Sequence, residues 1–295
     1  MTTCRTLETP RENDLDLRCA RNAAGLEIRV LPNGCLHALE HQGERLTVMI
    51  SQIHGAPTQG GIARLYLRVG GAEPMMLEAV GPGARVAFGA GAEGFSWEGE
   101  AGGLRHRVTL GLHPTLPLWL WRVAVENVGP GPRACGAILV QDIGLGSRGF
   151  VMGNEAYASQ YVDHHIADHP GCGPVVMSRQ TLAQGGTHPF VAHGCLEGAV
   201  AFATDAMQLL GPAFRDSGRV APGTDLPGRR LQHEVACPMI QSPDAQLAPG
   251  GTAAWTFFGL YDPDHPAASG AADLAAVDRA IAALLTGPLR AEPRA

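Results

Sequence analysis

The sequence contains no lysine, so its 22 Lys and Arg residues are all arginines, and they are dispersed along the chain without forming a basic run. Nucleic-acid-binding domains gather basic residues into a patch or stripe, and a chain with a net charge of −6 offers none. It also lacks any run of about 18 apolar residues, the length that a membrane-spanning helix needs. We therefore expect no nucleic-acid partner and no membrane segment, and an uncharged or weakly polar partner fits better.

Cysteine pairs of the C-x-x-C type are also missing. The seven cysteines are dispersed and odd in number, which is typical of reduced, mostly buried thiols. The first residues, MTTCRTLETPREND, are polar and acidic and do not resemble a signal peptide. The sequence therefore predicts a cytoplasmic location, and it predicts neither a cofactor nor a disulfide framework.

Apolar residues at helical spacing are nearly absent before the last thirty residues. The chain of 295 residues is instead rich in glycine (39) and proline (22), with 45% hydrophobic and 17% charged residues. Abundant turn residues in a chain that is hydrophobic enough to fold predict an all-β protein. Its length allows one large β domain or two small domains.

Predicted strands follow one another through turns that contain Gly, Pro or Asn. Pro32, Asn33 and Gly34 form a hairpin signal, and a meander is expected from 104–112, 117–128 and 134–145. The middle strand is apolar on both faces between Leu118 and Val125, which places it at the centre of a layered structure. Further strands are predicted at 62–69, 196–205, 207–214 and 253–262.

One amphipathic helix is predicted at 272–287, where Leu274, Val277, Ile281 and Leu284 recur at helical spacing. Its apolar stripe has two possible uses. Either it packs on the β structure, or it begins a further helical domain. The tail after it contains no closing element, which favours the second alternative.

A polar stretch at 154–180 is the candidate functional region. Sugar hydroxyls both donate and accept hydrogen bonds, so a sugar site needs fork-shaped polar groups beside flat rings. The plainer interpretation is a solvated loop, and a third is an interface to a neighbouring domain, which also favours Tyr and Arg. The residues predicted to contact a sugar or a domain are Glu155, Tyr157, Gln160, Tyr161, Arg179 and Gln180.

Five blocks carry a resemblance to a known family: QDIGL (141–145), NEAYASQYVDHH (154–165), SRQ (178–180), ATDAMQLLGPAF (203–214) and YDPDHPAAS (261–269). In this order, over roughly residues 25 to 275, they resemble the N-terminal β-supersandwich domain of family 94 glycoside phosphorylases and the related cyclic β-1,2-glucan synthases, formerly glycosyltransferase family 36. The resemblance implies an antiparallel, two-layer supersandwich of the galactose-mutarotase type. In such enzymes linker helices and an (α/α)6 barrel follow, and the barrel carries the catalytic acid.

The expected organisation is an irregular lead-in at 1–24, the supersandwich at 25–270, and a linker helix and tail at 271–295. The resemblance implies an accessory domain that supports a helical catalytic domain in cis or trans, helps form a subunit interface in a homodimer, and binds an oligosaccharide such as a β-glucan. None of the five blocks is the family's catalytic motif, so no catalytic residue is assigned to this chain.

Two rival functions stay open. A mutarotase-like epimerase needs a His acid and a Glu base across the anomeric carbon, which His165 or His193 with Glu155 or Glu234 would have to supply. The other rival is a purely structural assembly domain without affinity for glycans.

A metal site is not predicted, because the spacing of the polar residues in 163–172 matches no structural zinc pattern. The four tryptophans are expected to pack in the core, although Trp97 or Trp255 could also serve as a platform for a sugar ring. The residues weighed as metal ligands are His164, His165, His169 and Cys172.

Overall fold

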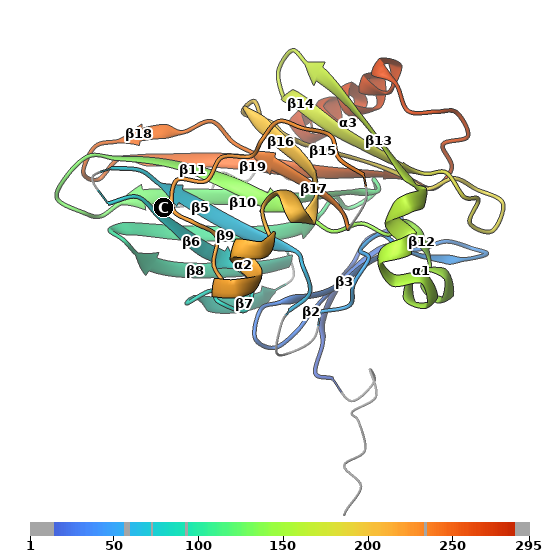
Figure 1. The fold of residues 1–295 in the computed structure, drawn as a ribbon, viewed down its shortest axis with the longest axis horizontal. Coiled ribbons are helices and arrows are strands. Elements are labelled where there is room, and N and C mark those ends of the chain that lie inside the picture. The colour runs from blue at the N-terminus through green and yellow to red at the C-terminus, as the bar shows by residue number, and fades with distance from the viewer. Residues whose placement is uncertain (1–14, 56–59, 72, 92–93, 233–234, 287–295) are drawn as a thin grey trace, which may run out of the picture.

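The computed structural model describes residues 15–55, 60–71, 73–91, 94–232 and 235–286, and its strands form three antiparallel sheets (Figure 1). The eight-stranded sheet has the order β13 (Val162–His169), β14 (Gly173–Gln180), β15 (Phe190–Cys195), β19 (Thr252–Asp262), β10 (Leu118–Asn127), β9 (Leu104–Leu112), β8 (Gly94–Ala101) and β7 (Ala87–Gly91). The six-stranded sheet consists of β16 (Ala201–Asp205), β17 (Ala236–Gln241), β11 (Arg133–Val140), β5 (Arg64–Val69) and β6 (Met75–Val80), with β18 (Ala245–Leu247) paired to β11.

A third, five-stranded sheet was not predicted. Its order is β1 (Arg18–Arg21), β2 (Leu26–Val30), β3 (Leu36–Gln42), β4 (Thr47–Met49) and β12 (Gly146–Ser147). The expectation of an irregular lead-in at 1–24 is therefore wrong for 18–21, because this segment pairs with β2 along its whole length. The side chain of Asn22 then donates to the carbonyl oxygens of His113 and Leu116, which holds the turn after β1.

The main core lies between the sheets and is filled by the period-2 alternation of their strands. In β10, Trp119 and Trp121 point into this core, while Leu118 and Leu120 point to the opposite face of the sheet. The strand lies between β9 and β19, so the predicted central position is confirmed. Gly259 on β19 lets the indole of Trp119 lie flat on the sheet, since a Cβ there would come within 2.1 Å of the ring.

All four tryptophans are buried, as the sequence predicted for the core. Trp97, one of the two that were weighed as sugar platforms, is 1% exposed and donates from Nε1 to the carbonyl oxygen of Gly34 at 2.9 Å. Trp255 is 3% exposed. Neither ring is open to a ligand, and the platform alternative is wrong for this conformation.

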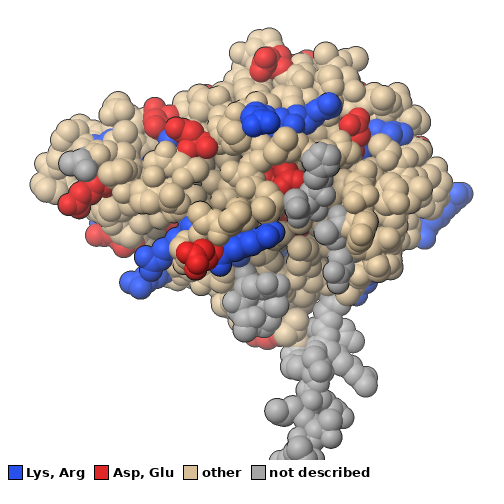
Figure 2. All heavy atoms as spheres, in the orientation of Figure 1, with Lys and Arg blue, Asp and Glu red and all other residues tan. Residues whose placement is uncertain are grey.

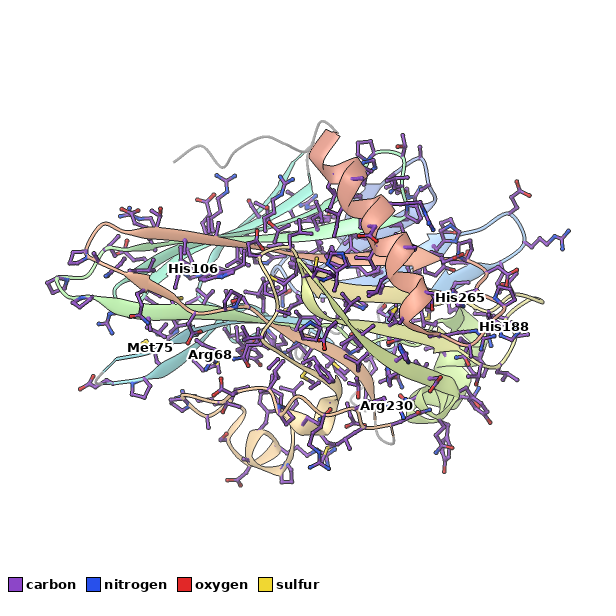
Figure 3. The ribbon with its side chains drawn as sticks, turned by 90° about the horizontal axis from the view of Figure 1, so that it is seen from above. Arg68, Met75, His106, His188, Arg230 and His265 are labelled. Atoms are coloured by element: carbon purple, nitrogen blue, oxygen red, sulfur yellow. The ribbon has the colours of Figure 1, made fainter. Side chains whose placement is uncertain are left out.

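The C-terminal helix α3 (Leu274–Thr286) follows a short turn of 3-10 helix, η4 (Ala271–Asp273). Val277, Ala280 and Leu284 bury the stripe of α3 against Leu118, Met177 and Phe258, among others, on the outer face of the eight-stranded sheet. Figure 3 shows α3 lying across this face, with His265 near its first turn. Of the two alternatives for the stripe, packing on the sandwich is the one observed.

Residues 207–214 contain no strand, so the strand predicted there is wrong. They run from η3 (Ala206–Gln208) through a turn into α2 (Pro212–Ser217). Asp205 caps η3 by accepting from the backbone NH of Met207 at 2.8 Å, and Pro212 occupies the first turn of α2. With the loop that follows, these helices cover the outer face of the six-stranded sheet, where Val220 and Leu226 are buried.

The polar stretch at 154–180 is more regular than a solvated loop. Two short helices, α1 (Arg148–Asn154) and η2 (Glu155–Tyr161), lead into the hairpin of β13 and β14.

Among the residues that the structure describes, no helix is long and apolar enough to cross a bilayer.

Candidate functional site

The helical turn η2 is anchored to the core by one buried serine. Ser159 donates from Oγ to Oε1 of Gln52 at 3.0 Å and accepts from the backbone NH of Ala236 at 2.7 Å. Asp142 of the QDIGL block completes the frame, because its carboxylate accepts from the backbone NH groups of Gln52 and Ile53 at 2.9 and 2.8 Å. This frame fixes which side chains of η2 face outward.

The outward side chains include three of the predicted contact residues. Tyr157 is 66% exposed, Tyr161 is 40% exposed, and Gln160 lies between them on the surface. The sequence left open whether the two tyrosines share a face. In the 3-10 helix η2 positions three apart are eclipsed, so Tyr157 and Tyr161, which are four apart, are both exposed but offset around the helix. Glu155 begins η2, but its side chain lies outside what the structure describes.

The two tyrosines belong to an exposed apolar cluster. Of the large hydrophobic side chains that are exposed in the described part of the chain, all but Val200 lie in α1, in η2 or just after β14. An apolar surface of this kind is typical of an interaction site. The members of this cluster are Met152, Tyr157, Tyr161 and Leu182.

A cleft of about 630 Å³ opens beside η2. Its described walls are Gln160 from η2 and the segment of Arg230, Leu231 and Gln232, and Figure 3 shows Arg230 on this loop beside the helical turns. Sequence reasoning found Gln160 but missed Arg230 and Gln232. The cleft thus combines amide and guanidinium groups with exposed tyrosines nearby.

The T-D-x-x-Q part of the 203–214 block holds the segment of Arg230, Leu231 and Gln232 in place. Oγ1 of Thr204 accepts from the backbone NH of Leu231 at 2.8 Å and donates to its carbonyl oxygen at 2.6 Å. The amide of Gln208 donates to the carbonyl oxygen of Arg229 at 2.8 Å, and Nη1 of Arg230 donates to that of His164 at 2.7 Å. The side chains of this motif therefore hold the loop that carries Arg230, and no local signal in the sequence marks Arg230 itself.

Arg179 and Gln180 lie in the interior and bond to backbone. Arg179 donates to the carbonyl oxygens of His265 and Pro266 at 2.6 and 2.9 Å, which ties the YDPDHP block to β14. Gln180 is fully buried and donates to the carbonyl oxygen of Gly144 at 3.2 Å. The structure therefore separates these two from the exposed tyrosines, although β13 and β14 pair as neighbours.

The histidines that a mutarotase-like reaction would need are not assembled in an open site. His193 is 1% exposed and lies edge-on to Trp119, and burial lowers its pKa to about 3. His165 lies on β13, while Glu234 lies outside the described residues. A neutral imidazole without access to solvent cannot act as an acid on a sugar, so His193 does not fit that role.

The histidines and the cysteine of 164–172 serve separate structural roles. Nδ1 of His164 is 2.8 Å from Oγ of Ser178. Nδ1 of His169 accepts from the backbone NH groups of Gly171 and Cys172 at the hairpin turn, and its Nε2 is 3.0 Å from Asp278 on α3. Within the described ranges, no group of three or more His, Cys, Asp or Glu residues is placed to hold a metal ion.

Charge is sparse on the face of the molecule seen in Figure 2. Arginine and acidic side chains are interspersed there, without a continuous basic area. A site on this face would therefore recognise a ligand by hydrogen bonds and ring contacts rather than by a field of one sign.

Among solved structures, a polysaccharide lyase resembles 83% of this chain over 33% of its own, with a TM-score of 0.55 and 13% identity. A bacterial glucoamylase complexed with acarbose resembles 92% of this chain over 34% of its own, with a TM-score of 0.52 and 8% identity. Likeness at this level of identity shows the fold alone. The predicted class, an all-β antiparallel supersandwich with a C-terminal helix, is confirmed.

The curated 1,2-beta-oligoglucan phosphorylase of Listeria innocua serovar 6a is 28% identical over 227 residues, which are 76% of this chain and 20% of the relative. The chain thus spans about a fifth of the length of that protein. A family model described as the SOGP N-terminal domain matches residues 29–259, which is most of the chain. The resemblance to the N-terminal domains of glycoside phosphorylases is therefore confirmed, and this chain belongs to the SOGP N-terminal domain family.

Proposed function

We propose that this chain is the accessory carbohydrate-contacting domain of a β-glucan-processing enzyme of the family 94 phosphorylase type, and that it acts in the cytoplasm beside a helical catalytic domain. Its membership of the SOGP N-terminal domain family supports this, as does the phosphorylase relative. Phosphorolysis needs an acid for the leaving oxygen and a route for phosphate to the anomeric carbon. In this proposal the partner domain supplies both.

The sugar-contacting site is the cleft beside η2, and the observation that carries this assignment is the grouping of Gln160, Arg230 and Gln232 around it. Each amide both donates and accepts, and the guanidinium adds a planar fork of donors. Two exposed tyrosines on the same helical turn, Tyr157 and Tyr161, offer ring faces beside these groups. Such a set suits an uncharged oligosaccharide.

The same corner serves as the contact to the helical domain. Met152 and Leu182 extend the tyrosines into an apolar surface that is costly to leave in water and useful to cover. Arg179 and Gln180 contribute to either contact indirectly, by holding the backbone on which the exposed residues stand. Glu155 remains a predicted contact through its position at the start of η2.

Calorimetric titration with β-1,2-, β-1,3- and β-1,4-linked gluco-oligosaccharides tests the sugar contact. We expect binding to the wild type, weakened about threefold to tenfold in Tyr161→Ala through the lost ring contact and at least as much in Arg230→Ala. Arg107→Ala is the matched control, because this arginine is exposed like Arg230 but lies on β9, away from the cleft, where it pairs with Glu98.

Two outcomes would overturn the sugar contact. One is no heat with any of the oligosaccharides at millimolar concentration, which leaves the corner as a surface for a domain only. The other is equal binding by Tyr161→Ala, Arg230→Ala and the wild type, which places the ligand elsewhere. A mutarotation rate above background would instead support the epimerase alternative.

A further inference from the structure

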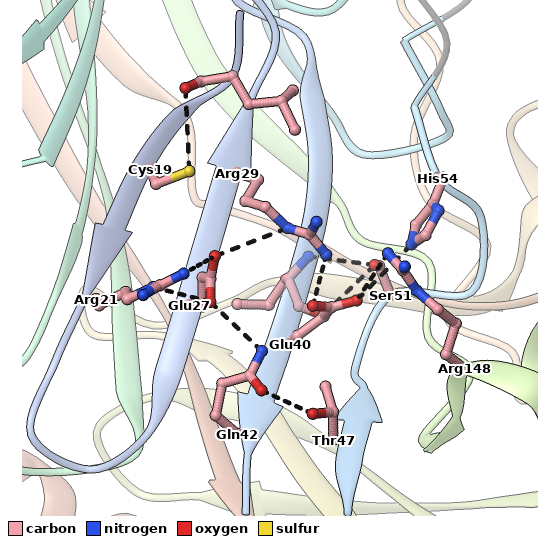
Figure 4. A network of polar contacts seen from close by, with 12 residues as sticks. Cys19, Arg21, Glu27, Arg29, Glu40, Gln42, Thr47, Ser51, His54 and Arg148 are labelled. Atoms are coloured by element: carbon pink, nitrogen blue, oxygen red, sulfur yellow. Dashed lines mark hydrogen bonds and ion pairs between the residues drawn. The ribbon is translucent and has the colours of Figure 1, made fainter. Parts of the chain in front are cut away.

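A second cleft, of about 300 Å³, lies on the five-stranded sheet, away from the cleft beside η2. Strands β2 and β3 turn Leu26, Ile28 and Leu39 into the core, so the residues between them face outward. There they meet Arg21 from β1 and Arg148 from α1 (Figure 4). The described residues that line this cleft are Arg21, Glu27, Arg29, Glu40, Gln42, Thr47 and Arg148.

Two carboxylates stand directly opposite each other in this cleft. Glu27 and Glu40 are cross-strand partners and are only 4% and 3% exposed. Like charges in this position destabilise a sheet, and burying them adds a desolvation cost. Arg21 offsets part of this at 2.9 Å from Glu27, and Arg29 at 2.5 Å from Glu40. A fold that needed only stability would place apolar or uncharged residues here.

One oxygen of Glu40 is buried and has no hydrogen-bond partner among the residues that the structure describes. Oε2 accepts from Arg29, but Oε1 lies 3.8 Å from Nε2 of His54 and 3.8 Å from Nη2 of Arg148, which is too far for a hydrogen bond in either case. Burial alone would raise the pKa of Glu40, but His54, Arg29 and Arg148 together lower it, so the carboxylate is charged. A buried, charged acceptor calls for a donor.

A ligand group at this point meets both signs of charge. A carboxylate only accepts hydrogen bonds and a guanidinium only donates them. A hydroxyl placed at this point donates to Glu40 and accepts from Arg148. One water, which occupies about 30 Å³, would also do so, but the cleft of about 300 Å³ has room for a larger molecule.

Charge argues against an anion. Three arginines and two glutamates nearly balance, and both glutamates would repel a phosphate or a carboxylate. The amide of Gln42 and the hydroxyl of Thr47, 2.7 Å apart, extend the row of mixed donors and acceptors. No described residue that lines the cleft is aromatic, so a ligand is held through its edges rather than by ring stacking.

We propose that this cleft is a second saccharide site, which binds one neutral sugar unit through a hydroxyl shared between Glu40 and Arg148. It does not depend on the cleft beside η2. The two sites have no described lining residue in common.

The test is a titration of the full chain with glucose and the β-1,2-linked glucose disaccharide, made in the Tyr161→Ala background so that the cleft beside η2 is weakened. We expect saturable binding that Arg148→Ala weakens about tenfold, the worth of one charge-assisted hydrogen bond. Glu40→Gln should weaken it as much. Arg105→Ala is the control, because this arginine is 58% exposed and paired with Glu126 on β10, outside the cleft.

Inorganic phosphate and glucuronate serve as anionic probes in the same variants. If they bind and glucose does not, the cleft is an anion site and the proposal is wrong. Saccharide binding that is unchanged in Arg148→Ala also overturns it, and so does the lack of any binding by a folded protein. Should Glu40→Gln fail to fold, Arg148→Ala decides alone, because that side chain is 43% exposed.

The two binding proposals are tested independently of each other. Loss of oligosaccharide binding in Arg230→Ala with intact glucose binding would support both proposals. Binding that depends on Arg148 but not on Arg230 would support only the second cleft.

Discussion

The two clefts of this domain use polar residues in opposite ways. Beside η2, the buried polar side chains of Asp142 and Gln180 bond to backbone, and the groups left for a partner stand exposed on a loop and a helical turn. On the five-stranded sheet, Glu27 and Glu40 are buried and line the cleft themselves. In the cleft beside η2, the residues that hold the backbone differ from those that would contact a ligand. In the cleft on the five-stranded sheet, the same residues do both.

This difference sets what a mutation reveals. In the cleft beside η2, contact residues can be changed without disturbing the frame, so binding and stability should respond separately. In the five-stranded sheet, the residues that would hold a ligand also neutralise one another. Binding and stability are therefore coupled there, and only exposed members such as Arg148 can separate them.

The largest effect should come from Arg29→Ala. Its guanidinium lies 2.5 Å from Glu40 and 3.9 Å from Glu27, and its side chain is only 14% exposed. Removing one partner of a buried ion pair costs about 3 to 5 kcal/mol, and urea unfolding should show a loss of this size. Arg21→Ala is the matched control, because that side chain is 71% exposed and its loss should cost well under half as much. Equal losses would contradict the idea of a buried network.

Acid should lower the free energy of unfolding through two buried histidines, His164 and His193. Burial, with a smaller contribution from Arg230, lowers the pKa of His164 from 6.5 to about 4, and burial, with a smaller contribution from His164, lowers that of His193 to about 3. As the pH falls, the unfolded chain takes up protons first, so the free energy of unfolding drops below pH 6.5. The two groups together amount to about 3 kcal/mol between pH 6.5 and pH 5.

Urea unfolding at several pH values, with His193→Leu as the comparison, measures this effect. The variant should lose about half of the slope that the histidines cause. A free energy of unfolding with the same pH dependence in both proteins would show that His193 does not stay neutral in the folded state.

A smaller loss is expected from the frame beside η2. Asp142→Ala leaves the backbone NH groups of Gln52 and Ile53 without their buried acceptor, at a cost of about 2 to 3 kcal/mol. Asp142→Asn keeps an acceptor oxygen and should lose less. Asp244→Ala, at a carboxylate whose side chain is 43% exposed, serves as the surface control. If all three variants unfold at the same urea concentration, Asp142 does not hold the frame.

The sequence predicted the β class and the burial of the tryptophans because those signals are local. Alternation and turn residues mark strands such as β10, and large apolar rings find the core in most packings. It missed β13, where His164 takes an inward position that alternation assigns to an apolar side chain. Ser178 on β14 gives this buried imidazole a hydrogen-bond partner, and the local sequence does not reveal that pairing.

Both clefts also depend on residues that are far apart in the chain. Glu27 and Arg29 look like ordinary outward-facing charges in the short strand LEIRV, and nothing local indicates that Arg148 from α1 will close over Glu40. Gln160 could be predicted from its motif, whereas Arg230 could not, because Gln208 and Thr204 place it through bonds to backbone. Motif residues thus predicted the frame better than the contact groups.

The smallest change in stability is expected from an exposed tyrosine of η2, and a buried serine of the same helix provides the comparison. Tyr157→Ala removes a ring that is 66% exposed, so the free energy of unfolding should change by less than about 0.5 kcal/mol. Two residues later, Ser159→Ala leaves the side chain of Gln52 and the backbone NH of Ala236 without a partner and should cost about 1 to 2 kcal/mol. Urea unfolding measures both, and oligosaccharide titration should rank them in the reverse order. A stability loss in Tyr157→Ala as large as that in Ser159→Ala would mean that the exposed tyrosines belong to the frame, and the cleft beside η2 would then lose its distinction from the charged cleft.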